Sequence, residues 1–105
     1  MKIKPGVRVL GLRPEILLAL VVAESIYRKH GAELVLTSVV EGSHSAGSLH
    51  YRGDAIALRT KGVGAAHVIF AELRATLTGD YDVLFENAGG VNEHIHLEYQ
   101  PKLPL

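Results

Sequence analysis

The chain has 105 residues, of which 48% are hydrophobic and 21% are charged, a composition typical of one globular domain and not of a disordered segment. Eleven basic residues balance eleven acidic residues, so the sequence lacks the basic field that would hold a nucleic-acid backbone. It has no cysteine, which excludes disulfide bonds and thiolate metal sites and leaves His, Asp and Glu as possible metal ligands.

The amino-terminal segment does not have the form of a signal peptide. Two lysines are followed by Pro5 and Gly6, and no sustained apolar segment comes after them. We therefore expect no secretion signal in this segment, and we expect a short strand over residues 7–10.

The first helix is expected to begin at Pro14. Proline is favourable as the first helical residue because its missing N–H would have no partner there. The helix should end near His30, before Gly31. Its apolar run, residues 16–23, is too short to cross a membrane and predicts a helix that is buried on most sides.

The rest of the chain predicts alternating strands and one more helix. Strands are expected over residues 33–40, 54–60, 81–86 and 94–99, and the second helix over residues 64–77. This order predicts one α+β domain over residues 1–105. We expect a small antiparallel sheet of about four strands, two helices packed on its apolar face and the functional site on its other face.

The strand at residues 94–99 carries two histidines on one face. Because side chains alternate along a strand, His94, His96 and Glu98 point away from the apolar residues between them. Two imidazoles on the polar face of a strand have the geometry that a divalent cation such as zinc uses. Surface strands also carry histidines without any chemistry, but Glu93 beside this pair favours a metal site.

The strand at residues 54–60 has a similar alternation. Ile56 and Leu58 should face the core, while Ala57 and Arg59 point the other way. Arg59, and Arg52 just before the strand, are candidates for binding a substrate carboxylate, because a guanidinium group forms bidentate pairs with carboxylates. Ordinary solvated arginines would give the same pattern.

Two ordered motifs give the chain a family resemblance over residues 36–101. The pattern Ser48-x-His50-x-x-Gly53-x-Ala55 resembles the start of the S-x-H-x-x-G-x-A-x-D signature of the M15 peptidases. These are D-Ala-D-Ala carboxypeptidases and L-alanyl-D-glutamate endopeptidases that cut peptidoglycan peptides. Glu93-x-x-His96 is similar to the E-x-x-H element of the same family.

The resemblance implies the same α+β fold and a zinc site. In it His50 and His96 would be metal ligands and Glu93 the general base for amide hydrolysis. The sequence pattern alone leaves open whether Glu93 or His94 is the base, and we expect Glu93 to be the base and His94 a neighbouring or transition-state group. Ser48 would orient His50 or bind substrate. The substrate would be a peptide of the cell wall. A chain this short, without a signal peptide or a wall-binding module, resembles phage-borne members of the group more than secreted bacterial enzymes, and we expect such a protein to act in the host cytoplasm or as part of a virion.

One residue departs from the family pattern. The family has an aspartate ligand where this chain has Ala57, and a methyl group cannot bind a metal. Asp54 falls on the opposite strand face, and Glu98 lies one step beyond His96, so neither replaces it well. We therefore expect zinc binding to be weak or absent. A natural pseudoenzyme, or an alanine substitution made to inactivate the protein, would both produce this pattern.

Two functions remain open from the sequence. The first is a zinc-dependent peptidoglycan peptidase that is inactive or impaired through Ala57. The second is a non-catalytic module that keeps the fold and binds a cell-wall peptide or a protein partner. The sequence predicts neither nucleic acid nor membrane as a partner and does not indicate an oligomeric state.

Overall fold

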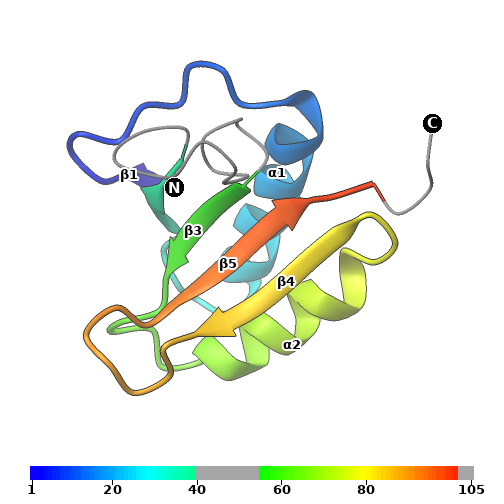
Figure 1. Ribbon diagram of the computed structural model, residues 1–105. Helices are drawn as coiled ribbons and strands as arrows, with labels where there is room; N and C mark the ends of the chain where they lie inside the picture. Colours follow the sequence, from blue (N-terminus) through cyan, green and yellow to red (C-terminus); the bar gives the residue numbers. More distant parts are fainter. Residues whose placement is uncertain (40–54, 102–105) are drawn as a thin grey trace.

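The computed structural model describes residues 1–39 and 55–101, and these ranges hold two helices and five strands (Figure 1). The α+β class expected from the sequence is confirmed. In chain order the elements are β1 (Lys2–Ile3), α1 (Pro14–Lys29), β2 (Val35–Ser38), β3 (Ala55–Arg59), α2 (Ala66–Thr76), β4 (Tyr81–Glu86) and β5 (His94–Tyr99).

The strands form one mixed sheet in the order β1-β2-β3-β5-β4. The sheet has five strands instead of about four, because the two-residue β1 adds a parallel edge next to β2. The other described pairs are antiparallel. The strand expected over residues 7–10 is wrong, since this segment is irregular. A two-residue strand gives no alternation in the sequence, and it is recognisable only through its hydrogen bonds to β2.

Both helices pack on one face of the sheet and lie behind it in Figure 1. Helix α1 begins at Pro14, as expected. Its expected burial on most sides is wrong, because Leu18 and Val21 are 62% and 67% exposed on the side away from the sheet. With both helices on the same sheet face, that side of α1 has no described element to pack against. Neither described helix is long and apolar enough to span a membrane.

The core lies between the helices and the covered face of the sheet. Ile56 and Leu58 of β3 are fully buried in this core, as expected, although Ala55 and Ala57 on the other face of the strand are buried as well. The opposite face, called the open face below, is covered by neither described helix and turns toward the viewer in Figure 1. The fully buried apolar residues include Ile16, Ala19 and Ala23 of α1, Leu36, Ile56 and Leu58 of the central strands, Ile69 and Leu73 of α2, and Ile95 and Leu97 of β5.

Candidate metal centre

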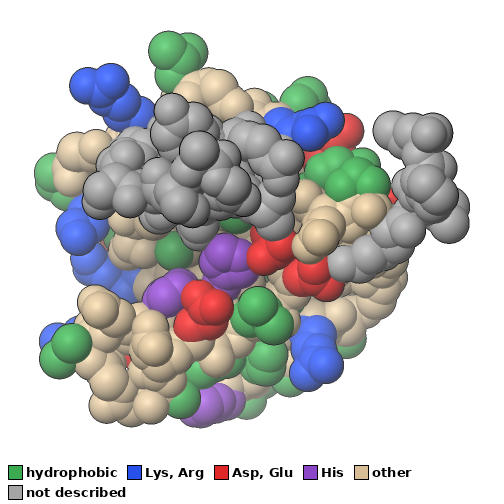
Figure 2. All heavy atoms as spheres, viewed as in Figure 1, with side chains coloured by type: hydrophobic (Ala, Val, Ile, Leu, Met, Phe, Trp, Pro, Cys, Tyr) green, Lys and Arg blue, Asp and Glu red, His purple; other side chains and the backbone are tan. Residues whose placement is uncertain are grey.

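The two histidines of β5 lie on the open face because of the strand register. In that register His94 is paired with Arg59 of β3 and with Glu86 of β4. His96 is paired with Ala57 on one side and Leu84 on the other. Figure 2 shows histidine side chains beside acidic ones in the middle of this face. The sheet thus brings side chains from three strands to one place.

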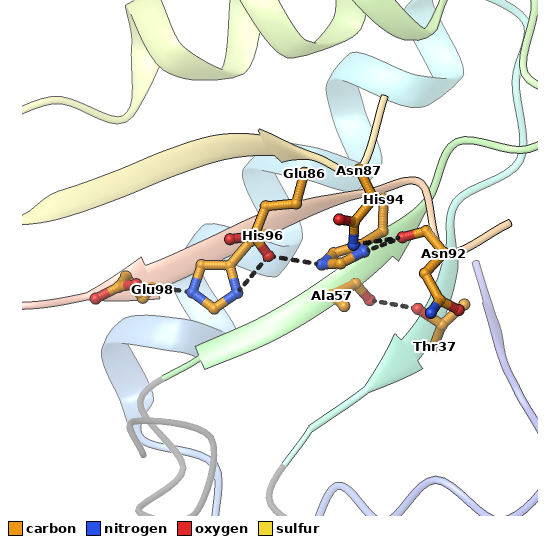
Figure 3. A network of polar contacts seen from close by, with 8 residues as sticks. All are labelled: Thr37, Ala57, Glu86, Asn87, Asn92, His94, His96 and Glu98. Carbon is orange, nitrogen blue, oxygen red and sulfur yellow. Dashed lines mark hydrogen bonds and ion pairs between the residues drawn. The ribbon is translucent and has the colours of Figure 1, made fainter. Parts of the chain in front are cut away.

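Three residues on this face converge tightly enough to hold a metal ion. Glu86, His94 and His96 each offer one ligand atom, and these atoms lie within 4.8 Å of one another. Nε2 of His94 lies 2.9 Å from Oε1 of Glu86, and Nδ1 of His96 lies 3.8 Å from the same oxygen (Figure 3). Two imidazoles and one carboxylate are a ligand set found in catalytic zinc sites. These three residues form what is called the metal centre below.

In each imidazole, the ring nitrogen that points away from Glu86 lies within hydrogen-bond distance of an oxygen. Nδ1 of His94 lies 2.6 Å from the carbonyl oxygen of Asn92, and Nε2 of His96 lies 2.7 Å from Oε1 of Glu98. A carbonyl or an ionised carboxylate only accepts, so these two nitrogens carry the protons. Nε2 of His94 and Nδ1 of His96 are thereby directed at Glu86. Such outer hydrogen bonds fix the tautomer and the ring orientation of metal-binding histidines.

The ring of His94 contacts two oxygens at once. Its ring lies between two acceptors, the Asn92 carbonyl and the Glu86 carboxylate. A neutral imidazole has only one N–H and can satisfy only one of them. A cation between the ring nitrogen and the Glu86 carboxylate would satisfy the other contact. The donor set therefore fits a divalent cation.

Ala57 lies directly opposite His96 on the open face. The two residues are paired in the β3–β5 register, and Ala57 is 6% exposed. Side chains directly opposite each other in an antiparallel pair have Cβ atoms about 4.5–5.5 Å apart. The position where the family resemblance implies an aspartate is thus the immediate cross-strand neighbour of His96.

Glu93 is held away from the imidazoles. Its carboxylate accepts a hydrogen bond from Oγ1 of the buried Thr60 at 2.5 Å and one from the backbone N–H of Gly89 at 3.0 Å. These two hydrogen bonds, from Gly89 first and from Thr60 second, lower the pKa of the Glu93 carboxyl below its ordinary value, and nearby His67 adds to the effect. Strand β5 begins at His94, as expected. Glu93 lies in the loop before this strand, where it binds Gly89 and Thr60, and it is not part of the metal centre.

The structure places the other sequence candidates as follows. Ser48, His50 and Arg52 lie outside the described residues. His94 and His96 are brought together, and Glu98 lies against the outer nitrogen of His96 and not between the imidazoles.

The sequence reasoning did not identify Glu86 as a candidate ligand. The available signal was the predicted hairpin of the strands at residues 81–86 and 94–99. In an antiparallel hairpin the last residue of the first strand faces the first residue of the second, as Glu86 faces His94.

A cavity of about 660 Å³ opens beside the metal centre. It lies over the ends of β2 and β3 and the loop before β5. Arg59 lines it, together with the loop that precedes His94. Its described lining residues are Lys4, Thr37, Ser38, Ala57, Arg59, Lys61, Asn87, Val91, Asn92, Glu93 and His94.

Comparison with known proteins gives no relatives from which a role could be transferred. No family model matches this chain, and neither a curated protein nor a solved structure matches it. A function for the chain is therefore argued from the geometry of the metal centre and from its two sequence motifs.

Proposed function

We propose that this chain is a zinc-binding peptidase-type domain that acts on amide bonds of cell-wall peptides and is impaired by Ala57. The observation that carries the proposal is the convergence of Glu86, His94 and His96 on the open face of the sheet. The motif around Ser48 and the Glu93-x-x-His96 element support the choice of peptide hydrolysis.

Three described residues could bind the ion, while Ala57 leaves out the aspartate that the family resemblance implies beside them. His94 would bind through Nε2, His96 through Nδ1 and Glu86 through its carboxylate, which makes the three protein ligands usual at catalytic zinc. Asn92 and Glu98 hold the two rings in the required orientation. Zinc, when bound, supplies a Lewis acid that polarises a carbonyl group and lowers the pKa of water.

A second candidate function is a binding module without turnover. Two observations favour it. Ala57 offers no oxygen beside His96, and the carboxylate of Glu93 is occupied by Thr60 and Gly89. If no residue in the described part of the chain acts as a base, the domain would hold a cell-wall peptide or a protein partner without cutting it.

Hydrolysis of purified peptidoglycan separates the two functions. The protein as given and an Ala57→Asp variant would each be incubated with peptidoglycan, with zinc and with a chelator, and released peptides identified by mass spectrometry. The peptidase proposal predicts zinc-dependent release by Ala57→Asp and little release by the protein as given. Zinc binding without release by either form would support the binding module and contradict the peptidase.

A control variant guards against a contaminating hydrolase. His96→Gln in the Ala57→Asp background removes one ligand while keeping a polar side chain of similar reach. Release that persists in this double variant would mean that the metal centre is not the source of activity.

A further inference from the structure

We propose that the cavity beside the metal centre is an anion-binding subsite that takes the carboxylate of a peptide. The choice of a peptide as the ligand rests on the proposed function. The choice of a carboxylate comes from the charges that line the cavity, and it is tested separately below.

Three cationic side chains meet at this cavity from separate parts of the chain. Lys4 follows β1, Arg59 ends β3, and Lys61 lies in the turn after β3. Lys4 lies there because the chain at β1 pairs with β2, and the backbone N–H of Lys4 donates to the carbonyl oxygen of Leu36 at 2.9 Å. All three side chains belong to exposed residues, so their charged ends are available to a ligand.

The described lining has an excess of positive charge although the whole chain is neutral. Its one carboxylate is that of Glu93, and this group already accepts hydrogen bonds from Thr60 and Gly89. The remaining polar side chains of the described lining are the hydroxyls and amides of Thr37, Ser38, Asn87 and Asn92, with the imidazole of His94. A concave surface lined by one sign of charge concentrates its field and attracts ligands of the opposite sign.

Arg59 links this cavity to the metal centre. It is the cross-strand partner of His94, so its side chain leaves β3 on the same face as the imidazole. Its backbone is fixed, because the hydroxyl group of Tyr27 donates to the Arg59 carbonyl oxygen at 2.9 Å. A guanidinium group binds a carboxylate through two parallel hydrogen bonds, which gives direction as well as charge. A peptide anchored here by its carboxylate would extend past His94.

Binding of three short peptides tests this inference. The probes are N-acetyl-Ala-Ala with a free carboxylate, the same peptide with a carboxamide end, and N-acetyl-Glu-Ala with a carboxamide end. Dissociation constants would be measured by isothermal titration calorimetry at low salt, with zinc and with a chelator. We expect one or both acids to bind about 10-fold tighter than the neutral peptide, a difference of about 1.4 kcal/mol. The acid with the lower dissociation constant shows whether the subsite prefers a main-chain or a side-chain carboxylate.

Arg59→Gln is the decisive variant, and Arg74→Gln on the exposed surface of α2 is its matched control. Arg59→Gln should abolish the preference for the acids, whereas Arg74→Gln should keep it. Thermal unfolding would confirm that both variants fold. Equal binding of acids and amide, or a preference that survives Arg59→Gln, would overturn the inference. A preference that persists in a protein that binds no zinc would support the subsite while contradicting the proposed function.

Discussion

Ala57 and His96 face each other across the β3–β5 strand pair, on the open side of the sheet. The methyl group of Ala57 is nearly buried beside an imidazole whose Nδ1 is directed at Glu86. A carboxylate at position 57 would therefore reach the metal centre from the side opposite Glu86, since Leu84 and Glu86 belong to the strand on the other side of β5.

Ala57→Asp should strengthen zinc binding and weaken the metal-free protein. The new carboxylate adds a ligand, so we expect the dissociation constant for zinc to fall at least about 10-fold. Without metal, the same charge is placed where few water molecules reach, and the free energy of unfolding should decrease. Thermal unfolding with and without zinc measures both effects, because a bound ligand raises the melting temperature. Unchanged zinc affinity in a folded variant would contradict the placement of residue 57 at the centre.

Glu98 should matter for zinc affinity without touching the metal. It accepts the hydrogen bond from Nε2 of His96 and so keeps Nδ1 turned toward Glu86. We expect Glu98→Ala to weaken zinc binding by about 10- to 100-fold, as outer contacts of metal-bound histidines usually do. Glu98→Gln should weaken zinc binding less, since its amide oxygen can still accept the hydrogen bond from Nε2 of His96. The tautomer of His96, read from ¹⁵N NMR shifts, should become mixed in Glu98→Ala only.

A control for the Glu98 variants is Glu33→Gln, which removes an exposed carboxylate that pairs with Lys2. Equal zinc affinity in Glu98→Ala and in the unaltered protein would show that Glu98 does not orient the imidazole.

Much of the fold was predictable from local patterns, because its elements follow rules that act within a few residues. Pro14 starts α1, and in β3, β4 and β5 the alternate residues that pack in the core are apolar, although Ala55 and Ala57 on the other face of β3 are also buried. β1 was missed because two residues have no periodicity. The exposed side of α1 was missed because its sequence is apolar all round, and only the arrangement of the layers decides which side is covered.

The metal centre was predictable in part. The pair His94 and His96 follows from alternation along one strand. Glu86 depends on the register between two strands, which sequence alternation does not fix in detail. The contacts of Glu93 depend on Thr60, a residue distant in the chain, and no pattern near either residue indicates them.

The stability contributed by Glu93 should depend on pH in the acidic range. The pKa of its carboxyl is lowered in the folded protein, so the ionised form is favoured by folding. Its contribution is complete above the pKa of the unfolded chain, about 4.3, and is lost as the pH falls through the lower folded value. Urea unfolding of the protein and of Glu93→Gln should therefore differ at pH 7 and converge toward pH 3.

Glu33→Gln, an exposed Glu-to-Gln change, controls for loss of a charge alone. Thr60→Val, which removes the hydroxyl donor, should reproduce part of the Glu93→Gln effect at neutral pH. A difference between the protein and Glu93→Gln that stays constant from pH 7 to pH 3 would contradict the assigned contacts.

Substitutions in the core should lower the free energy of unfolding much more than substitutions on the surface. Ile95 is fully buried between His94 and His96 in the sequence but on the other face of β5, whereas Val21 is largely exposed on α1. We expect Ile95→Ala to lower the free energy of unfolding by about 2–5 kcal/mol. Val21→Ala should change it by about 0.5 kcal/mol or less. Similar losses in the two variants, measured by chemical denaturation, would contradict the assignment of Ile95 to the core and of Val21 to the surface.

Zinc stoichiometry tests the central claim most directly. The protein, treated first with a chelator, would be titrated with zinc and compared with Glu86→Gln, His94→Gln and His96→Gln, while Glu33→Gln serves as the control. The proposed centre predicts one zinc ion per chain, bound by the unaltered protein and by Glu33→Gln, with at least a 10-fold loss of affinity (about 1.4 kcal/mol) in each of the other three variants. No zinc binding by the unaltered protein, or binding that survives all three substitutions, would contradict it.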